Sequence, residues 1–233
     1  MRFSQRPIAS AIAARTTGLG LAAAVLATAI ALAPNHARAE SNFVNGAGTA
    51  TARLNFSIVI PKFLYLQVGT GTFPTTVATV DTIVFDMTSA IGSIGNGTAQ
   101  SATSGGDIAA GQVTARVVGN NFTAATNLTA TTSGAMGNGS GGTISWSEIS
   151  VASPTAITVV PAAASVLQHP GSLAAPFADG AATTVSLTPV NRVINQAANW
   201  TFSYKNTNVP ASGTYGTGGS GTNGQVTYTI AMP

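Results

Sequence analysis

The sequence contains no cysteine and very little charge. It has 233 residues, of which only 6% are Asp, Glu, Lys or Arg. Without cysteine there are no disulfides and no typical cysteine-ligated zinc site. Outside a cell, the stability of such a chain must come from core burial, from sheet hydrogen bonds, or from association with neighbouring molecules.

The few charges are distributed unevenly. Four of the nine bases are arginines within the first 39 residues, which contain no acid. The rest of the chain carries five bases and six acids, a net charge of −1. Nucleic-acid binding needs clustered Lys and Arg, so nucleic acid is excluded as an expected partner. A chain that is 45% apolar and this weakly charged should also fold rather than stay disordered.

Residues 1–39 have the three parts of a secretory signal peptide. An arginine-containing start precedes an apolar run at 18–33, and the small-residue end is Ala37-Arg38-Ala39. The run of about 16 residues is shorter than the roughly 20 that span a bilayer. We therefore expect cleavage after Ala39 and export to the periplasm, the cell surface or the medium, with no transmembrane segment afterwards. A retained N-terminal anchor is the alternative.

Alternation of apolar and polar side chains recurs after this leader and predicts short strands. The expected strands are 53–60, 63–68, 80–87, 113–118, 126–132, 143–151, 156–160, 183–188, 200–205 and 226–231. No window shows helical spacing, and the proline-containing stretch 161–182 is expected to form a long loop.

Short strands separated by Gly, Ser, Thr and Asn predict an all-β fold. The expected architecture is one domain over 40–233, an antiparallel two-sheet sandwich of about nine or ten strands. A closed β-barrel is the alternative.

The residues that usually carry chemistry are sparse and scattered. His169 is the only histidine after the leader and is expected in an exposed loop. Asp81 and Asp86 should point to opposite faces of one strand, and Asp107 and Asp179 should cap turns. No nucleophile elbow or calcium-loop pattern occurs. We therefore predict no catalytic, cofactor or metal site, and we do not expect an enzyme.

Most large aromatic side chains fall at alternating positions within expected strands, where rings usually fill a core. These are Trp146, Trp200, Phe202, Tyr204 and Tyr228. Tyr65 and Tyr215 are expected to be exposed instead. A secreted carbohydrate-binding module is one of two functions that we consider, the other being a structural or adhesive role. If the protein is such a module, these two tyrosines are the candidate glycan contacts.

Strand edges have little charge to protect them. Monomeric sheet proteins often place lysine on exposed edges, but only Lys62 and Lys205 follow the leader. Edges that are not protected are available for strand addition between subunits. The candidate strand-donor residues are the in-phase apolar side chains Leu54, Phe56, Ile58 and Ile60. The same alternation also fits an ordinary first strand.

Two stretches carry a family resemblance: ARLNFSIVIPKFLYLQVGTGT at 52–72 and NWTFSYKNTNVPASGTYGTGGSGTNGQVTYTIAMP at 199–233. In layout the chain resembles Gram-negative secreted proteins of the pilin-like, fimbrial type. The export signal, the strand-only pattern, the few charges and the missing catalytic set together predict a structural or adhesive protein of the cell surface or extracellular matrix. The resemblance implies an Ig-like or pilin-like form of the expected all-β sandwich. It also implies a periplasmic chaperone, and polymerisation with itself or contact with other surface proteins. The chain departs from pilins in lacking their cysteine pair and in having Met232 where they carry an aromatic residue.

Overall fold

The computed structural model describes residues 40–216 and 222–232. The predicted signal peptide, 1–39, lies outside the described residues. The chain divides into two units, Met1–Ile60 and Pro61–Pro233. All the described strands belong to the second unit, whereas residues 40–60 form neither strand nor helix.

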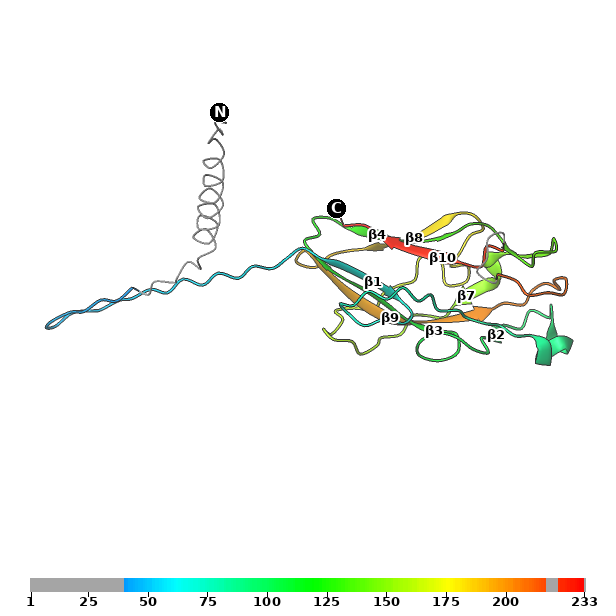
Figure 1. Cartoon of the computed structure of the whole chain (residues 1–233), viewed down its shortest axis with the longest axis horizontal. Helices are drawn as coiled ribbons and strands as arrows, with labels where there is room; N and C mark the ends of the chain where they lie inside the picture. Colours follow the sequence, from blue (N-terminus) through cyan, green and yellow to red (C-terminus); the bar gives the residue numbers. More distant parts are fainter. Residues whose placement is uncertain (1–39, 217–221, 233) are drawn as a thin grey trace, which may run out of the picture. The chain divides into compact units, whose positions relative to one another are not determined.

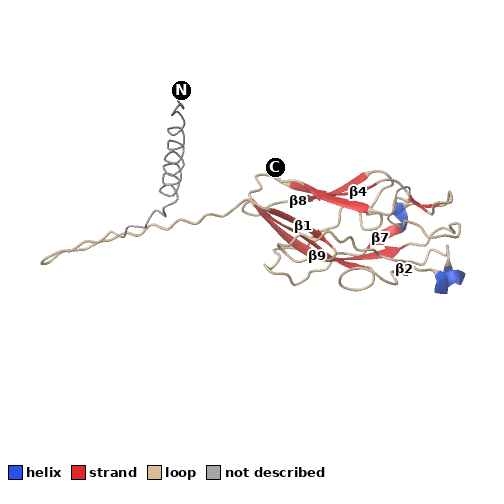
Figure 2. Ribbon diagram, in the orientation of Figure 1, coloured by secondary structure: helices blue, strands red, loops and turns tan. Residues whose placement is uncertain are grey.

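The second unit consists of short strands with two 3₁₀ turns (Figure 2). The strands are β1 (Leu64–Val68), β2 (Gln100–Ser101), β3 (Gln112–Asn120), β4 (Thr126–Thr132), β5 (Met136–Gly137), β6 (Thr143–Ile144), β7 (Ile149–Val151), β8 (Ala182–Leu187), β9 (Val193–Tyr204) and β10 (Val226–Ile230). The 3₁₀ turns are η1 (Thr88–Ser93) and η2 (Trp146–Glu148).

The strands form two antiparallel sheets packed face to face (Figure 1). The first has the order β1-β3-β9-β2, and β7 also pairs with β9. The second has the order β10-β4-β8, and β5 and β6 form a separate small hairpin. Each main sheet ends in edge strands, so the described strands do not close into a barrel. The predicted all-β two-sheet sandwich is confirmed.

The core lies between the two sheets, around the aromatic side chains of β9. Trp200 is fully buried, and its indole Nε1–H donates to the carbonyl of Leu167 (3.0 Å). Phe202 and Tyr204, on the same face of β9 as Trp200, are also buried. Trp146, which belongs to η2, is buried as well. The prediction that these rings belong to the core is therefore confirmed.

Two expected strands, 80–87 and 156–160, are not strands. Val84 makes a single bridge to Ser104, and 156–160 forms no pairing at all. Residues 80–87 nevertheless alternate in burial, because Ile83 and its in-phase neighbours pack against the core from a loop. Alternation reports one buried face, and a loop lying on a core shows it without a hydrogen-bonded ladder.

The expected strand 143–151 is interrupted by η2, which positions a buried carboxylate. Glu148 is 8% exposed. Its carboxylate accepts hydrogen bonds from the backbone N–H of Thr207 (2.9 Å), from the Thr207 hydroxyl and from Nδ2 of Asn208 (3.2 Å). These bonds fix the chain just beyond the end of β9.

Replacing this carboxylate should destabilise the sandwich. Glu148→Ala leaves the Thr207 donors without their acceptor and should lower the free energy of unfolding by about 2–3 kcal/mol, measured by urea denaturation. The matched control is Glu40→Ala, because Glu40 makes only an exposed ion pair with Arg53 (2.8 Å). Such exposed pairs contribute little to stability. Equal losses in the two variants would contradict the structural role of Glu148.

Candidate functional site

The apolar segment 53–60 is not a strand, which corrects the prediction of a half-buried strand there. Its in-phase side chains are all exposed: Leu54 (56%), Phe56 (86%), Ile58 (85%) and Ile60 (73%). Alternation determines which face of a segment can be buried, but a strand also needs a neighbouring backbone, and 53–60 forms no ladder or bridge with any described residue. Burying one such side chain is worth about 1.5–3 kcal/mol, so this segment can gain from a partner.

The second unit has, at one side of the sandwich, two strand edges that could accept an added strand. β1 and β10 are end strands of opposite sheets, and they contact each other (Figure 1). No described strand pairs with the outer edge of either one, and we call these two edges together the β1–β10 edge. Its inward-facing apolar side chains pack against the core but remain partly exposed: Leu64, Leu66, Val68, Val226, Tyr228 and Ile230. The core is therefore incompletely covered along this edge.

The backbone of β1 offers unused ladder positions. Its odd-numbered residues bond to β3, and this pattern continues to Gly69, whose N–H donates to the carbonyl of Thr114 (2.8 Å). In an antiparallel ladder the even-numbered residues then present their N–H and C=O groups to the other side. Leu64, Leu66 and Val68 thus direct main-chain donors and acceptors to the free edge and side chains to the core.

Just before β1, Asn120 makes three hydrogen bonds to the chain. Asn120, the last residue of β3, donates from Nδ2 to the carbonyl of Pro61 (2.8 Å). Its Oδ1 accepts from the N–H of Phe63 (3.0 Å), and its backbone N–H donates to the Phe63 carbonyl (3.2 Å). Residues 61–63 therefore continue the line of β1. Sequence reasoning missed Asn120, because nothing in the sequence distinguishes it from the many other asparagines.

The two candidate glycan contacts lie in different surroundings. Tyr65 is on the outer face of the first sheet, edge-on to Phe73 (5.2 Å between centroids), and its hydroxyl donates to Oε1 of Gln67 (3.0 Å). The hydroxyl of Tyr215 donates to the carbonyl of Ala211 in a different loop. The structure does not bring these two tyrosines together.

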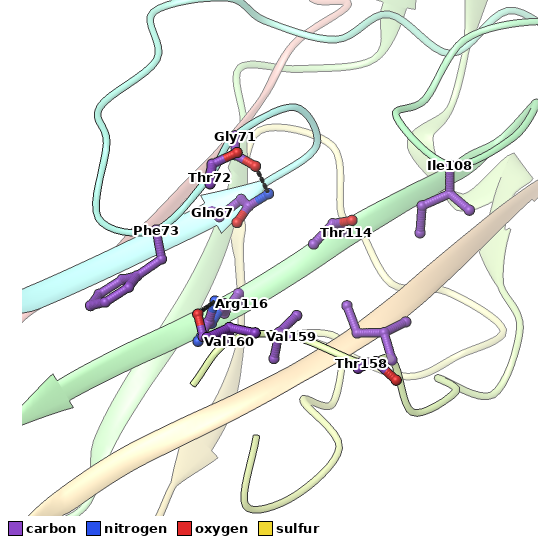
Figure 3. A pocket seen from close by; sticks show the side chains of 11 residues that line it. Gln67, Gly71, Thr72, Phe73, Ile108, Thr114, Arg116, Thr158, Val159 and Val160 are labelled. Carbon is purple, nitrogen blue, oxygen red and sulfur yellow. Dashed lines mark hydrogen bonds between the residues drawn. The ribbon is translucent and has the colours of Figure 1, made fainter. Parts of the chain in front are cut away.

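An open pocket of about 490 Å³ lies beside Gln67 on the outer face of the first sheet (Figure 3). Its polar and apolar lining comes from two strands and three loops: Gln67, Gly71, Thr72, Phe73, Ile108, Thr114, Arg116, Ile157, Thr158, Val159 and Val160. Tyr65 stands next to this pocket through its bond to Gln67, whereas Tyr215 is not part of its lining.

Arg116 forms one wall of the pocket and is only 3% exposed. Its guanidinium donates to the carbonyls of Val160 (3.1 Å) and Pro161 (2.8 Å) and lies 5.2 Å from the centre of the Phe73 ring (Figure 3). Burial lowers the pKa of Arg116 from its ordinary value. The charge thus fastens the 157–161 loop to the sheet.

His169 is 2% exposed, so the prediction of an exposed loop histidine is wrong. The ring lies edge-on to four aromatic side chains, those of Phe177, Trp200, Phe202 and Tyr228. Sequence reasoning placed it at the surface because proline follows it, yet the loop at 161–182 folds inward and buries Leu167 and Phe177 in the core.

Both nitrogens of the His169 ring are used. Nδ1 lies 2.7 Å from the carbonyl of Pro170, which can only accept, so Nδ1 carries the hydrogen. Nε2 then accepts from the Tyr228 hydroxyl (2.9 Å). Burial lowers the pKa of His169 to about 4 and raises the pKa of Tyr228. The neutral imidazole therefore ties the 161–182 loop to β10.

The remaining acids hold loops in place. Asp107 accepts from the N–H of Thr114 (2.7 Å) and Asp179 from the N–H of Trp146 (2.7 Å), so each bonds another segment rather than capping its own turn. Within 40–216 and 222–232, no three His, Cys, Asp or Glu side chains group closely enough to bind a metal ion. No helix in those ranges is long and apolar enough to cross a membrane.

Comparison of the chain with protein-family models, with curated proteins and with solved structures finds no match. The function is therefore inferred from the geometry of the molecule. The two main elements of the candidate site are the exposed alternating segment 53–60 and the β1–β10 edge.

The buried histidine predicts a specific response to acid. Because the pKa of His169 is about 4 in the folded protein and about 6.5 in the unfolded chain, the unfolded chain binds a proton more readily between these values. The contribution of His169 to stability is complete above pH 6.5 and is lost as the pH falls towards 4, by up to about 3 kcal/mol.

The measurement is the free energy of unfolding at pH 7 and pH 4, for the wild-type chain and for His169→Gln. Glutamine does not titrate, so the variant should be less stable at pH 7 but should lose less stability on acidification. The same loss between the two pH values in both proteins would show that His169 does not titrate as described.

Proposed function

We propose that this protein is an exported, non-enzymatic structural or adhesive component of the cell surface or extracellular matrix, whose copies assemble by strand addition. Segment 53–60 of one copy adds to the β1–β10 edge of another, as in a fimbrial-like polymer. The observation that carries the proposal is that one chain contains both an exposed alternating apolar segment and a partly uncovered core edge.

The strand order supports this assignment. In Ig-like sandwiches one sheet has the order A-B-E-D and the other contains C, F and G. Here β1-β3-β9-β7 corresponds to A-B-E-D, and β4 and β10 correspond to C and F. No described strand occupies the G position beside β10, while β8 is an addition on the far side of β4. A donated strand at the β1–β10 edge would complete the sandwich.

The chemistry of the two parts is complementary. The free edge of β1 supplies main-chain donors and acceptors, which give affinity in strand addition, and the partly exposed core supplies contacts for alternate side chains. The chain after the leader carries only eleven charged side chains, so little charge repulsion opposes close association of copies. A periplasmic chaperone would cover the same edge before assembly, since an open edge invites aggregation.

The test is assembly of the chain that begins at Glu40, the expected mature start. Gel filtration and electron microscopy at neutral pH should show concentration-dependent oligomers or fibres. The double variant Phe56→Asp/Ile58→Asp should remain monomeric, because it places carboxylates on the face that enters the core. The matched control Asn55→Asp/Ser57→Asp adds the same charge to the opposite face and should still assemble.

A wild-type chain that stays monomeric at high concentration would refute strand addition. Equal loss of assembly in both double variants would show that charge alone, rather than the alternating face, is responsible.

Carbohydrate binding is the second candidate, and the pocket beside Tyr65 favours it. The pocket presents the hydroxyl-bearing side chains of Thr72, Thr114 and Thr158 next to an aromatic ring. Such a combination of polar groups and apolar surface suits a sugar.

Under this second candidate, glycan-array binding should be lost in Thr114→Val/Tyr65→Ala and retained in Tyr215→Ala, because only the first variant alters the pocket. Circular dichroism checks that both variants fold. Binding that is lost only in Tyr215→Ala would exclude the pocket as the sugar site.

A further inference from the structure

Segment 53–60 can reach the β1 strand of its own chain in one way only. Three residues, 61–63, separate it from Leu64, the first residue of β1. A parallel placement beside β1 needs a crossover of a dozen or more residues, which this connection does not provide. Intramolecular use of the edge therefore requires an antiparallel hairpin that reverses direction within 61–63.

The register of that hairpin is determined by the number of residues in the connection. A three-residue turn over 61–63 places Ile60 opposite Leu64 and Ile58 opposite Leu66. These are even-numbered residues on both strands, so apolar side chains would face the core, and the main-chain groups of Leu64 and Leu66 would be bonded. Side-chain pattern alone thus permits the chain to fill its own edge.

The backbone at 61–63 opposes this hairpin. The carbonyl of Pro61 and both main-chain groups of Phe63 are already bonded to Asn120 in an extended conformation. The Phe63 ring also packs against Phe73, with 6.0 Å between centroids. Reversal within 61–63 would break these contacts, and the proline ring narrows the backbone conformations available for the turn.

We infer that Asn120 keeps the chain from filling its own β1–β10 edge and thereby leaves that edge for segment 53–60 of a second copy. The inference rests on the proposed function. It assigns Asn120 as a positioning residue that controls whether strand addition is intramolecular or intermolecular.

The test uses a cysteine pair in a chain that has no cysteine of its own. Ile58→Cys/Leu66→Cys places the two thiols opposite each other only if the hairpin forms, at the separation that disulfides favour. The chain from Glu40 is oxidised at low concentration, and non-reducing electrophoresis separates intramolecular from intermolecular disulfides. Circular dichroism and urea unfolding confirm that each variant is folded.

With Asn120 present, we expect few intramolecular disulfides. Adding Asn120→Ala should raise their fraction about tenfold, because the two side-chain bonds, to the Pro61 carbonyl and from the Phe63 N–H, are then absent and the turn has only one main-chain bond left to break. The matched control is Asn195→Ala, which removes a similar asparagine bond, to the carbonyl of Ala162 (2.7 Å), elsewhere on the first sheet. This control should leave the fraction unchanged. An equal fraction with and without Asn120 would overturn the inference.

A second variant leaves Asn120 intact. Inserting Gly-Asn-Gly after Ile60 supplies a four-residue turn, Ile60-Gly-Asn-Gly, outside the bonded residues. Phe56 then lies opposite Leu64 and Leu54 opposite Leu66, so the apolar side chains still face the core, and the chain should fill its own edge and become monomeric. If this variant assembles as the wild type does, the connection at 61–63 does not direct assembly.

Failure of the proposed function has a different result. The wild-type chain would then be monomeric and the Phe56→Asp/Ile58→Asp variant would not differ from it, whereas failure of the Asn120 inference leaves wild-type assembly intact.

Discussion

The pairing of β3 with β9 is the interaction on which the rest of the sandwich depends. It joins Gln112–Asn120 to Val193–Thr201 in one uninterrupted antiparallel ladder, the longest in the structure. β9 carries the aromatic side chains that fill the space between the sheets, and β1, β2 and β7 all attach to this pair. Because the chain has no cysteine, its stability depends on the burial organised by this ladder and not on disulfides.

Much of the fold was predictable because alternation directly reflects burial. The segment 126–132 is the strand β4 with the predicted bounds, and Trp200 and Phe202 are buried as their spacing indicates. The errors have one cause: side-chain pattern says nothing about where a backbone finds its hydrogen bonds. Residues 80–87 are half-buried without a ladder, and residues 53–60 alternate without being buried.

Of the two elements of the candidate site, only segment 53–60 was predictable from the sequence. The side chains of Phe56 and Ile58 stand out in the sequence, but the uncovered edge depends on which strands end each sheet, and this is a property of topology. Asn120 and His169 act through contacts with residues far away in the sequence, Pro61 in the first case and Tyr228 in the second. Such contacts leave no local periodic signal, so a single sequence does not reveal them.

The short stretch 61–63 also has a mechanical consequence. Three residues span at most about 10 Å even when fully extended. A subunit that binds segment 53–60 of another copy would therefore lie almost directly against the sandwich of that copy. A filament built in this way would have little freedom at its joints and would resist bending. Its stiffness would be determined by three residues and one asparagine side chain rather than by the bulk of each subunit.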